Sequence, residues 1–193
     1  MCGVEAGMAG WRAALAPALV GGALLAGCAS TTVAFDPPQP AALCEPDAAA
    51  RVLWASRWRV DQKDVAARER AAEDGLRIFL LADGCFARAE LRRVEALDAV
   101  LQAERARASS DGVVMLGIEI QELGPIVRLF ASPALVEGGT QVVFRVLSHP
   151  SHGAAVAQAF TVRWQNGGPG VIKGVEHLRD DMRAALRSGL RDR

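Results

Sequence analysis

The chain has 193 residues, of which 51% are hydrophobic and 23% charged, and this composition is typical of one globular domain with a short additional segment. Its 22 basic residues balance its 22 acidic residues, so the formal net charge is zero. This balance excludes the basic field that drives sequence-independent binding to nucleic acid, and we expect no nucleic-acid partner.

The first element is an uncharged apolar stretch at residues 13–27. It is too short, and too often interrupted by Gly and Pro, for a stable membrane span, and it matches the apolar region of a secretory signal. The stretch ends in Leu25-Ala26-Gly27-Cys28. This tetrapeptide resembles the lipobox of bacterial lipoproteins, in which a Leu precedes an invariant cysteine by three positions, with small residues between them.

The resemblance implies that residues 1–27 are a lipoprotein signal peptide and that Cys28, once lipidated with diacylglycerol and palmitate, is the first residue of the mature protein. More than one acyl chain anchors a protein durably, because each buried CH₂ contributes about 0.8 kcal/mol. Ala29 stands where members kept in the inner membrane often carry Asp. The resemblance therefore implies an outer-membrane anchor with the domain in the periplasm.

Two cysteines remain beyond the signal peptide and Cys28, namely Cys44 and Cys85. In an oxidising compartment we expect them to form a disulfide, although two separate buried thiols are the alternative. The sequence contains no CxxC motif, so a redox enzyme is not indicated.

Residues 28–50 contain four of the nine prolines and few large apolar residues. We interpret this segment as the lipidated cysteine followed by a Pro-rich tether, which leads to a single α/β domain at residues 51–193. The domain is expected to begin with a half-buried strand at residues 52–60, because apolar residues alternate there with polar ones. The side chains expected on one face of this strand are Val52, Trp54, Trp58 and Val60.

The remaining pattern alternates between helical and strand periods. A helix is predicted from about residue 63 to 81, ending at Asp83-Gly84, and it is followed by a strand at 86–94 and an amphipathic helix that begins near Leu97. Later strands are predicted at 114–120, 126–130, 140–147 and 155–164, with a break or bend at Gly124-Pro125, and a last helix begins near Val175.

This order of elements predicts an α/β (α+β) sandwich. We expect one mixed, mainly antiparallel sheet with amphipathic helices packed mostly on one of its faces.

Few residues in the sequence offer chemistry. His149 and His152 are close enough in sequence to share a metal, but Pro150 and Gly153 favour a solvated turn and no third ligand lies nearby. The glycine-rich segment 166–174 lies where a phosphate could bind between a strand and a helix, but it lacks the P-loop ending and favours a structural turn. Because no catalytic, metal or cofactor motif occurs, we expect a protein that is not an enzyme and has no cofactor.

Trp54, Trp58 and Trp164 are predicted on strand faces that they share with aliphatic residues. They either pack in the core beneath the helices or form an apolar face for a ligand or partner. The layout of a lipidated cysteine, a tether, an α/β domain and a closing helix is similar to that of small envelope accessory lipoproteins, such as the auxiliary lipoproteins of ABC-type transport systems. The similarity implies a non-enzymatic accessory or scaffold protein for envelope transport or assembly, with an envelope protein as its partner; a binding module for lipid or another apolar ligand is the alternative.

Overall fold

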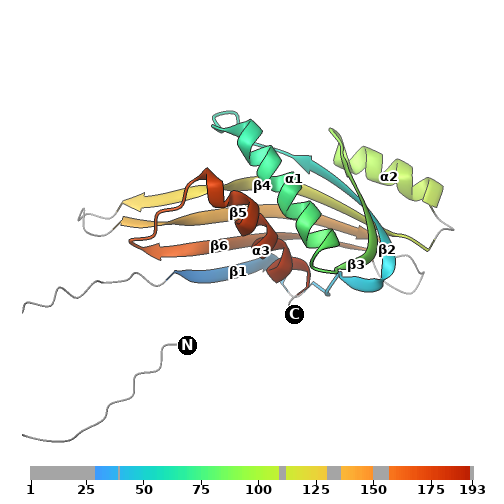
Figure 1. Ribbon diagram of the computed structural model, residues 1–193. Coiled ribbons are helices and arrows are strands. Elements are labelled where there is room, and N and C mark those ends of the chain that lie inside the picture. The colour runs from blue at the N-terminus through green and yellow to red at the C-terminus, as the bar shows by residue number, and fades with distance from the viewer. Residues whose placement is uncertain (1–28, 39, 109–111, 130–135, 150–156, 192–193) are drawn as a thin grey trace, which may run out of the picture.

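The computed structural model describes residues 29–38, 40–108, 112–129, 136–149 and 157–191. Within these ranges the chain forms one six-stranded sheet and three α-helices (Figure 1). The strands are β1 (Ser30–Asp36), β2 (Glu45–Ser56), β3 (Phe86–Arg93), β4 (Val114–Leu129), β5 (Val136–His149) and β6 (Gln158–Pro169). The helices are α1 (Val65–Leu81), α2 (Leu97–Ala108) and α3 (Leu178–Leu190), and a short 3-10 turn at Val175–His177 precedes α3.

The strands lie in the order β1-β6-β5-β4-β2-β3. The pairs β1–β6, β6–β5 and β5–β4 are antiparallel, whereas β2 runs parallel to both β4 and β3. Parallel neighbours need crossover connections, and α1 and α2 provide them. The predicted fold class, one mixed and mainly antiparallel sheet, is therefore confirmed.

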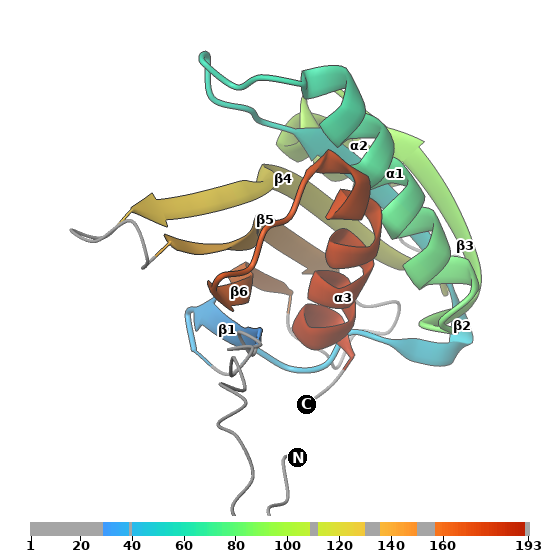
Figure 2. The same ribbon diagram turned by 60° about the vertical axis from the view of Figure 1, so that its left-hand side comes forward.

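Helices α1 and α3 lie side by side on one face of the sheet (Figure 2), as predicted for most of the helices. The main core lies between them and the sheet, and it includes Trp54 of β2 and Phe144 of β5. Helix α2 packs on the opposite face and closes a smaller core around Leu53 and Met115. Trp54 and Leu53 point into different cores because successive side chains of a strand face opposite sides. No helix in the described ranges is long and apolar enough to span a membrane.

The predicted tether at residues 28–50 is wrong over two stretches. Residues 30–36 form the edge strand β1, and β2 begins at Glu45 rather than near residue 52, so the sheet domain starts at Ser30. Two apolar residues explain why this segment joins the sheet. Val33 pairs with Trp164, and the ring of Phe35 lies 6.5 Å from that of Phe160. Such contacts across neighbouring strands stabilise a sheet edge.

The strand predicted at residues 52–60 ends earlier than expected. The backbone N–H of Arg57 donates to the carbonyl of Ile120 at 2.8 Å, after which the chain leaves the sheet and turns toward α1. Trp58 therefore lies beyond the end of the strand, where it still packs against the main core that contains Trp54, whereas Val60 is fully exposed.

Of the break or bend predicted at Gly124-Pro125, the break is wrong. Residues 114–129 form the single strand β4, and its irregularity is a shift in register between Ile120 and Glu122. A bulge of this kind absorbs an extra residue without ending the strand.

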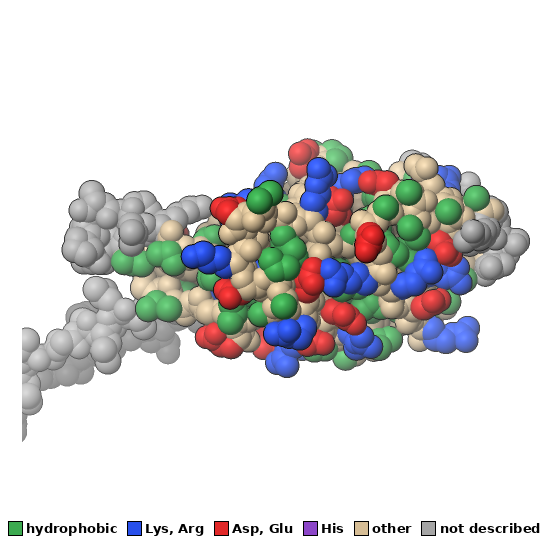
Figure 3. All heavy atoms as spheres, turned by 90° about the horizontal axis from the view of Figure 1, so that it is seen from above, with side chains coloured by type: hydrophobic (Ala, Val, Ile, Leu, Met, Phe, Trp, Pro, Cys, Tyr) green, Lys and Arg blue, Asp and Glu red, His purple; other side chains and the backbone are tan. Residues whose placement is uncertain are grey.

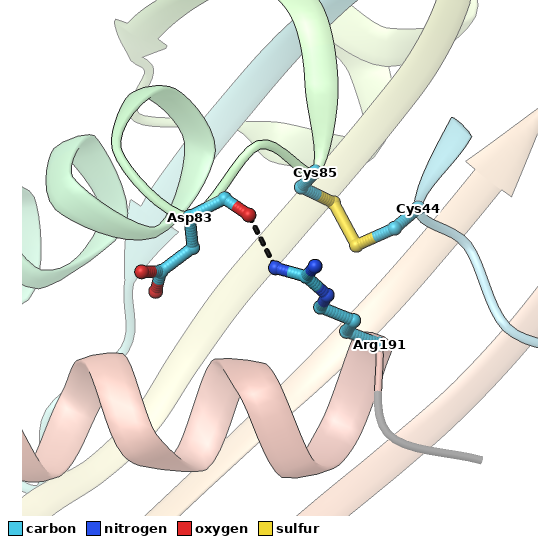
Figure 4. The surroundings of a disulfide bond; sticks show 4 residues. All are labelled: Cys44, Asp83, Cys85 and Arg191. Carbon is cyan, nitrogen blue, oxygen red and sulfur yellow. Dashed lines mark hydrogen bonds between the residues drawn. A yellow bond between two sulfur atoms is a disulfide. The ribbon is translucent and has the colours of Figure 1, made fainter. Parts of the chain in front are cut away.

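A disulfide joins Cys44 and Cys85, which confirms the predicted pairing. Cys44 lies just before β2 and Cys85 just before β3, so the bridge holds together the beginnings of two parallel neighbours. Figure 4 shows Arg191 beside the bridge, where its guanidinium donates to the carbonyl of Asp83. These contacts hold the end of α3 against the loop that follows α1.

Asp83 also contacts α3 through its side chain. Arg183 Nε donates to Asp83 Oδ2 at 2.9 Å, and the Asp83 side chain is buried, at 6% exposed. The hydrogen bonds from Arg183 lower the pKa of Asp83 below its usual value and outweigh the burial that raises it. Asp83 is therefore ionised at neutral pH and clamps α1 to α3.

The double substitution Cys44→Ala/Cys85→Ala should lower the free energy of unfolding by about 4 kcal/mol. The reason is that the bridge spans a sequence separation of 41 residues and restricts the unfolded chain. In a domain of this size the loss corresponds to a fall in Tm of roughly 10 °C. Scanning calorimetry of the oxidised wild type and the variant measures it, and equal melting temperatures would contradict a stabilising bridge.

Stability should fall as the pH drops below about 4, partly through Asp83. Its pKa is lower in the folded than in the unfolded chain, so its contribution is complete above the unfolded pKa and is lost as the pH falls through the folded pKa. Asp83→Asn should be less stable at pH 7 by roughly 1 kcal/mol and should show a smaller acid-induced loss. Urea denaturation at pH 7 and pH 3.5 measures both, with Asp47→Asn, at an exposed position of β2, as the control. Identical pH profiles for wild type and Asp83→Asn would show that Asp83 is not a source of the acid sensitivity.

Candidate functional site

The three tryptophans of the predicted ligand or partner face do not come together on the surface. Trp54 is 1% exposed and Trp164 is 2% exposed, and both are buried in the main core with α1 and α3. Trp58, which follows β2, is partly buried against the same core and is the one of the three that also lines a groove. Trp54 and Trp164 therefore follow the core-packing alternative.

The sheet face opposite α1 and α3 is covered only in part. Helix α2 packs over β2 and β4, away from β1 and β6 (Figure 1). Val142 and Val162 point into the main core, so the residues that follow them in β5 and β6, Val143 and Arg163, point to this opposite face. This uncovered part of the sheet carries a groove.

The groove has a volume of about 460 Å³ and is open to solvent along its length. The pairing register places Glu122, Val143 and Arg163 in one row across β4, β5 and β6. The segment that leaves β2 forms the adjoining wall. We call this feature the arginine groove; its lining residues are Arg57, Trp58, Arg59, Gln121, Glu122, Gln141, Val143 and Arg163.

Three guanidinium groups and one carboxylate line the arginine groove. Arg59 Nε lies 3.7 Å from Glu122 Oε2 and 3.9 Å from Asp61 Oδ1, and such loose exposed pairs contribute less than about 1 kcal/mol each. Arg57 and Arg163 form no ion pair with any residue of the described ranges. The groove therefore carries an excess of positive charge in a chain that is neutral overall.

Glu69 of α1 fixes the position of Trp58. The indole Nε1 of Trp58 donates to Glu69 Oε1 at 3.4 Å, the hydroxyl of Ser56 donates to the same oxygen at 3.0 Å, and Arg93 forms an ion pair with it. Burial raises the pKa of Glu69 and is the largest single effect, but the three hydrogen bonds and the charge of Arg93 together lower the pKa below its usual value. An ionised Glu69 thus holds one wall of the groove in place.

The other residues considered in the sequence lie apart from the arginine groove. His149 ends β5, and burial, followed by the charge of Arg105, lowers its pKa below the usual value. His152, its potential partner, and the predicted lipidation site Cys28 lie outside the described residues. In the part of the chain that the structure describes, no three His, Cys, Asp or Glu residues are grouped so that they could hold a metal ion.

The arginine groove was missed from the sequence because its residues come from four separate segments. Arg57, Trp58 and Arg59 are consecutive, but the alternation of apolar and polar residues predicts that they continue a strand. Gln141 and Arg163 are ordinary polar residues of alternating strands, and only the β4-β5-β6 register brings them beside Glu122.

No protein-family model matches this chain, and no curated protein matches it. Among solved structures the chain is similar to the PelC dodecamer from Paraburkholderia phytofirmans, with 16% identity, a TM-score of 0.46, and coverage of 85% of this chain and 99% of that chain. A variant of the same PelC has 15% identity, a TM-score of 0.42 and coverage of 83% and 95%. A neuraminyllactose-binding hemagglutinin homolog from Helicobacter pylori has 10% identity, a TM-score of 0.36 and coverage of 74% and 79%. These likenesses are remote.

Proposed function

We propose that this protein is a lipid-anchored accessory protein of the bacterial cell envelope. Cys28 holds it in the outer membrane, its domain lies in the periplasm, and the arginine groove docks an acidic surface of an envelope protein. The role is that of a scaffold or binding protein rather than an enzyme.

The position of Cys28 carries this proposal. It ends the lipobox-like tetrapeptide after an uncharged stretch, and it stands only two residues before Ser30, the first residue of β1. The segment with the character of a signal therefore ends where the folded domain begins. The Cys44–Cys85 disulfide also supports an exported protein, because such bridges persist in oxidising compartments such as the periplasm.

The arginine groove supports docking to a protein. It is shallow and open, whereas sites for small molecules are usually enclosed and mostly apolar. Arg57 and Arg163 offer two guanidinium groups without acidic partners in the described ranges, and arginine pairs well with carboxylates in both geometry and charge. Trp58 adds the kind of fixed aromatic surface that often dominates binding energy at protein interfaces. Binding of an apolar ligand between tryptophans has less support, since Trp54 and Trp164 are buried in the core.

Cys28→Ser should abolish the anchor. Cells fed an alkyne analogue of palmitate should label the wild type and not Cys28→Ser, and the wild type should sediment with outer-membrane vesicles in a sucrose gradient. The signal segment of the variant should remain uncleaved, or the protein should be found unattached, because lipidation precedes cleavage in the family it resembles. Labelling of the variant at the wild-type level would refute the lipoprotein assignment.

The substitutions Arg57→Glu and Arg163→Glu together should reverse the charge of the groove and abolish docking. A photo-crosslinking residue at Gln141 should capture a defined envelope protein in cells, and the double variant should reduce this product at least tenfold. The matched control is Arg70→Glu/Arg88→Glu, which makes the same change of charge at exposed positions of α1 and β3. An equal effect of both double variants would refute docking at the groove and leave the lipid-anchor result untouched.

A further inference from the structure

One end of the sheet is marked by a row of paired residues. Ser30 pairs with Gly167, Gly167 with Gly139, and Gly139 with Ile126, so the row crosses β1, β6, β5 and β4. The chain therefore enters the domain at the end where β4 and β6 finish, on the left in Figure 1. Val127 lies one position beyond this row, opposite Gly138.

Apolar side chains are exposed at this end of the sheet. Val127 is 67% exposed, and Ile172, in the loop after β6, is 90% exposed. Pro169 is exposed as well. We call Val127, Pro169 and Ile172 the apolar tip. Figure 3 shows hydrophobic side chains at the corresponding left-hand end of the molecule.

Two glycines hold the loop that carries Ile172. The Val171 carbonyl packs directly on Gly138, where a Cβ would lie only 2.1 Å from the oxygen. Gly170 has a φ of +72°, and its N–H donates to the carbonyl of Val136 at 2.8 Å. The loop therefore folds back across the end of β5. It lies on the face of the sheet that carries the side chain of Val127, which pairs with Gly138.

The charge of this loop is turned inward. Lys173 is the only charged residue between Gly167 and Val175. Its Nζ lies 2.6 Å from Asp181 Oδ1 and 5.9 Å from the ring centroid of Trp164, and its side chain is only 16% exposed. The loop thus presents apolar atoms to its surroundings, while its one ammonium group is neutralised beneath it.

We propose that the apolar tip enters the interfacial region of the bilayer that carries the anchor, as a second membrane contact beside Cys28. The inference rests on the proposed function, because the lipid anchor supplies the bilayer. Only Ala29 lies between Cys28 and Ser30, and a step of two residue positions along the chain spans at most about 7 Å. Val127 lies beyond the row that contains Ser30. An anchor at Cys28 therefore places the apolar tip at the membrane surface. The partner that contacts the tip is then the lipid bilayer itself.

The test uses chemical anchoring, so that it does not depend on acylation in cells. The chain from residue 28 onward, with Cys44 and Cys85 oxidised, is coupled through Cys28 to maleimide lipid in vesicles of phosphatidylethanolamine and phosphatidylglycerol. A tryptophan is introduced by Ile172→Trp at the tip or by Leu81→Trp as the control. Leu81 is 60% exposed and lies near Cys85, at the opposite end of the sheet.

Lipids brominated near the headgroup should quench the added emission of Ile172→Trp at least twofold and leave that of Leu81→Trp unchanged. Adding Val127→Asp should reverse the quenching of Ile172→Trp, since a carboxylate resists entry into the bilayer. Absence of quenching at both positions would overturn the tip contact even if Cys28 is acylated in cells. Equal quenching at both would also overturn it, because the domain would then lie on the bilayer without a preferred end.

A second copy of the chain is the competing occupant. The Cys28→Ser protein without lipid should have the same sedimentation coefficient as the variant that adds Val127→Asp and Ile172→Asp. A dimer that forms with the tip intact and disappears in this variant would overturn the proposal, because the tip would then bind another copy.

Discussion

The antiparallel pairing of β1 with β6 determines where the N-terminal part of the chain leaves the domain. Seven residues of β1 pair in register with β6, and Phe35 packs against the main core with its ring near that of Phe160. The pairing puts Ser30 at the end where β4 and β6 finish. The positions of the proposed anchor, the apolar tip and the arginine groove relative to one another all depend on this pairing. A free segment of the same length would fix none of these positions.

The two ends of the sheet are stabilised by different interactions. At one end, a disulfide, the buried Asp83 carboxylate and Arg191 tie the beginnings of β2 and β3 to α3. At the other end, close backbone packing at Gly138 and the inward Lys173–Asp181 pair shape a surface that exposes Ile172. The interactions at the first end hold strands and helices together. Those at the second end leave apolar side chains exposed for the proposed contact with the bilayer.

The parts of the fold that depend on local patterns were predictable from the sequence. The helix at 63–81 closely matches α1, and the Cys44–Cys85 bridge followed from having two cysteines left to pair. The sequence signal for β1 is short and is masked by the prolines that follow it, so its pairing with β6 could not be foreseen. The arginine groove depends on the register among three strands and on the turn at Arg57, which are properties of tertiary packing. The sequence does indicate Trp58, but as part of an apolar face shared with Trp54 and Trp164.

The short connection between Cys28 and Ser30 has an entropic consequence. A domain on a long flexible tether would tumble freely, and docking would then have to restrain that rotation. Here the sheet begins at Ser30, two positions after the proposed anchor Cys28, so acylation would already restrict its orientation relative to the bilayer normal. Gln141 and Val143 lie two and four residues along β5 from the marked row, or about 7 and 13 Å at the rise of a β-strand. A partner would then meet the groove at a fixed distance from the membrane. Much of the loss of rotational entropy on docking would already have occurred on anchoring.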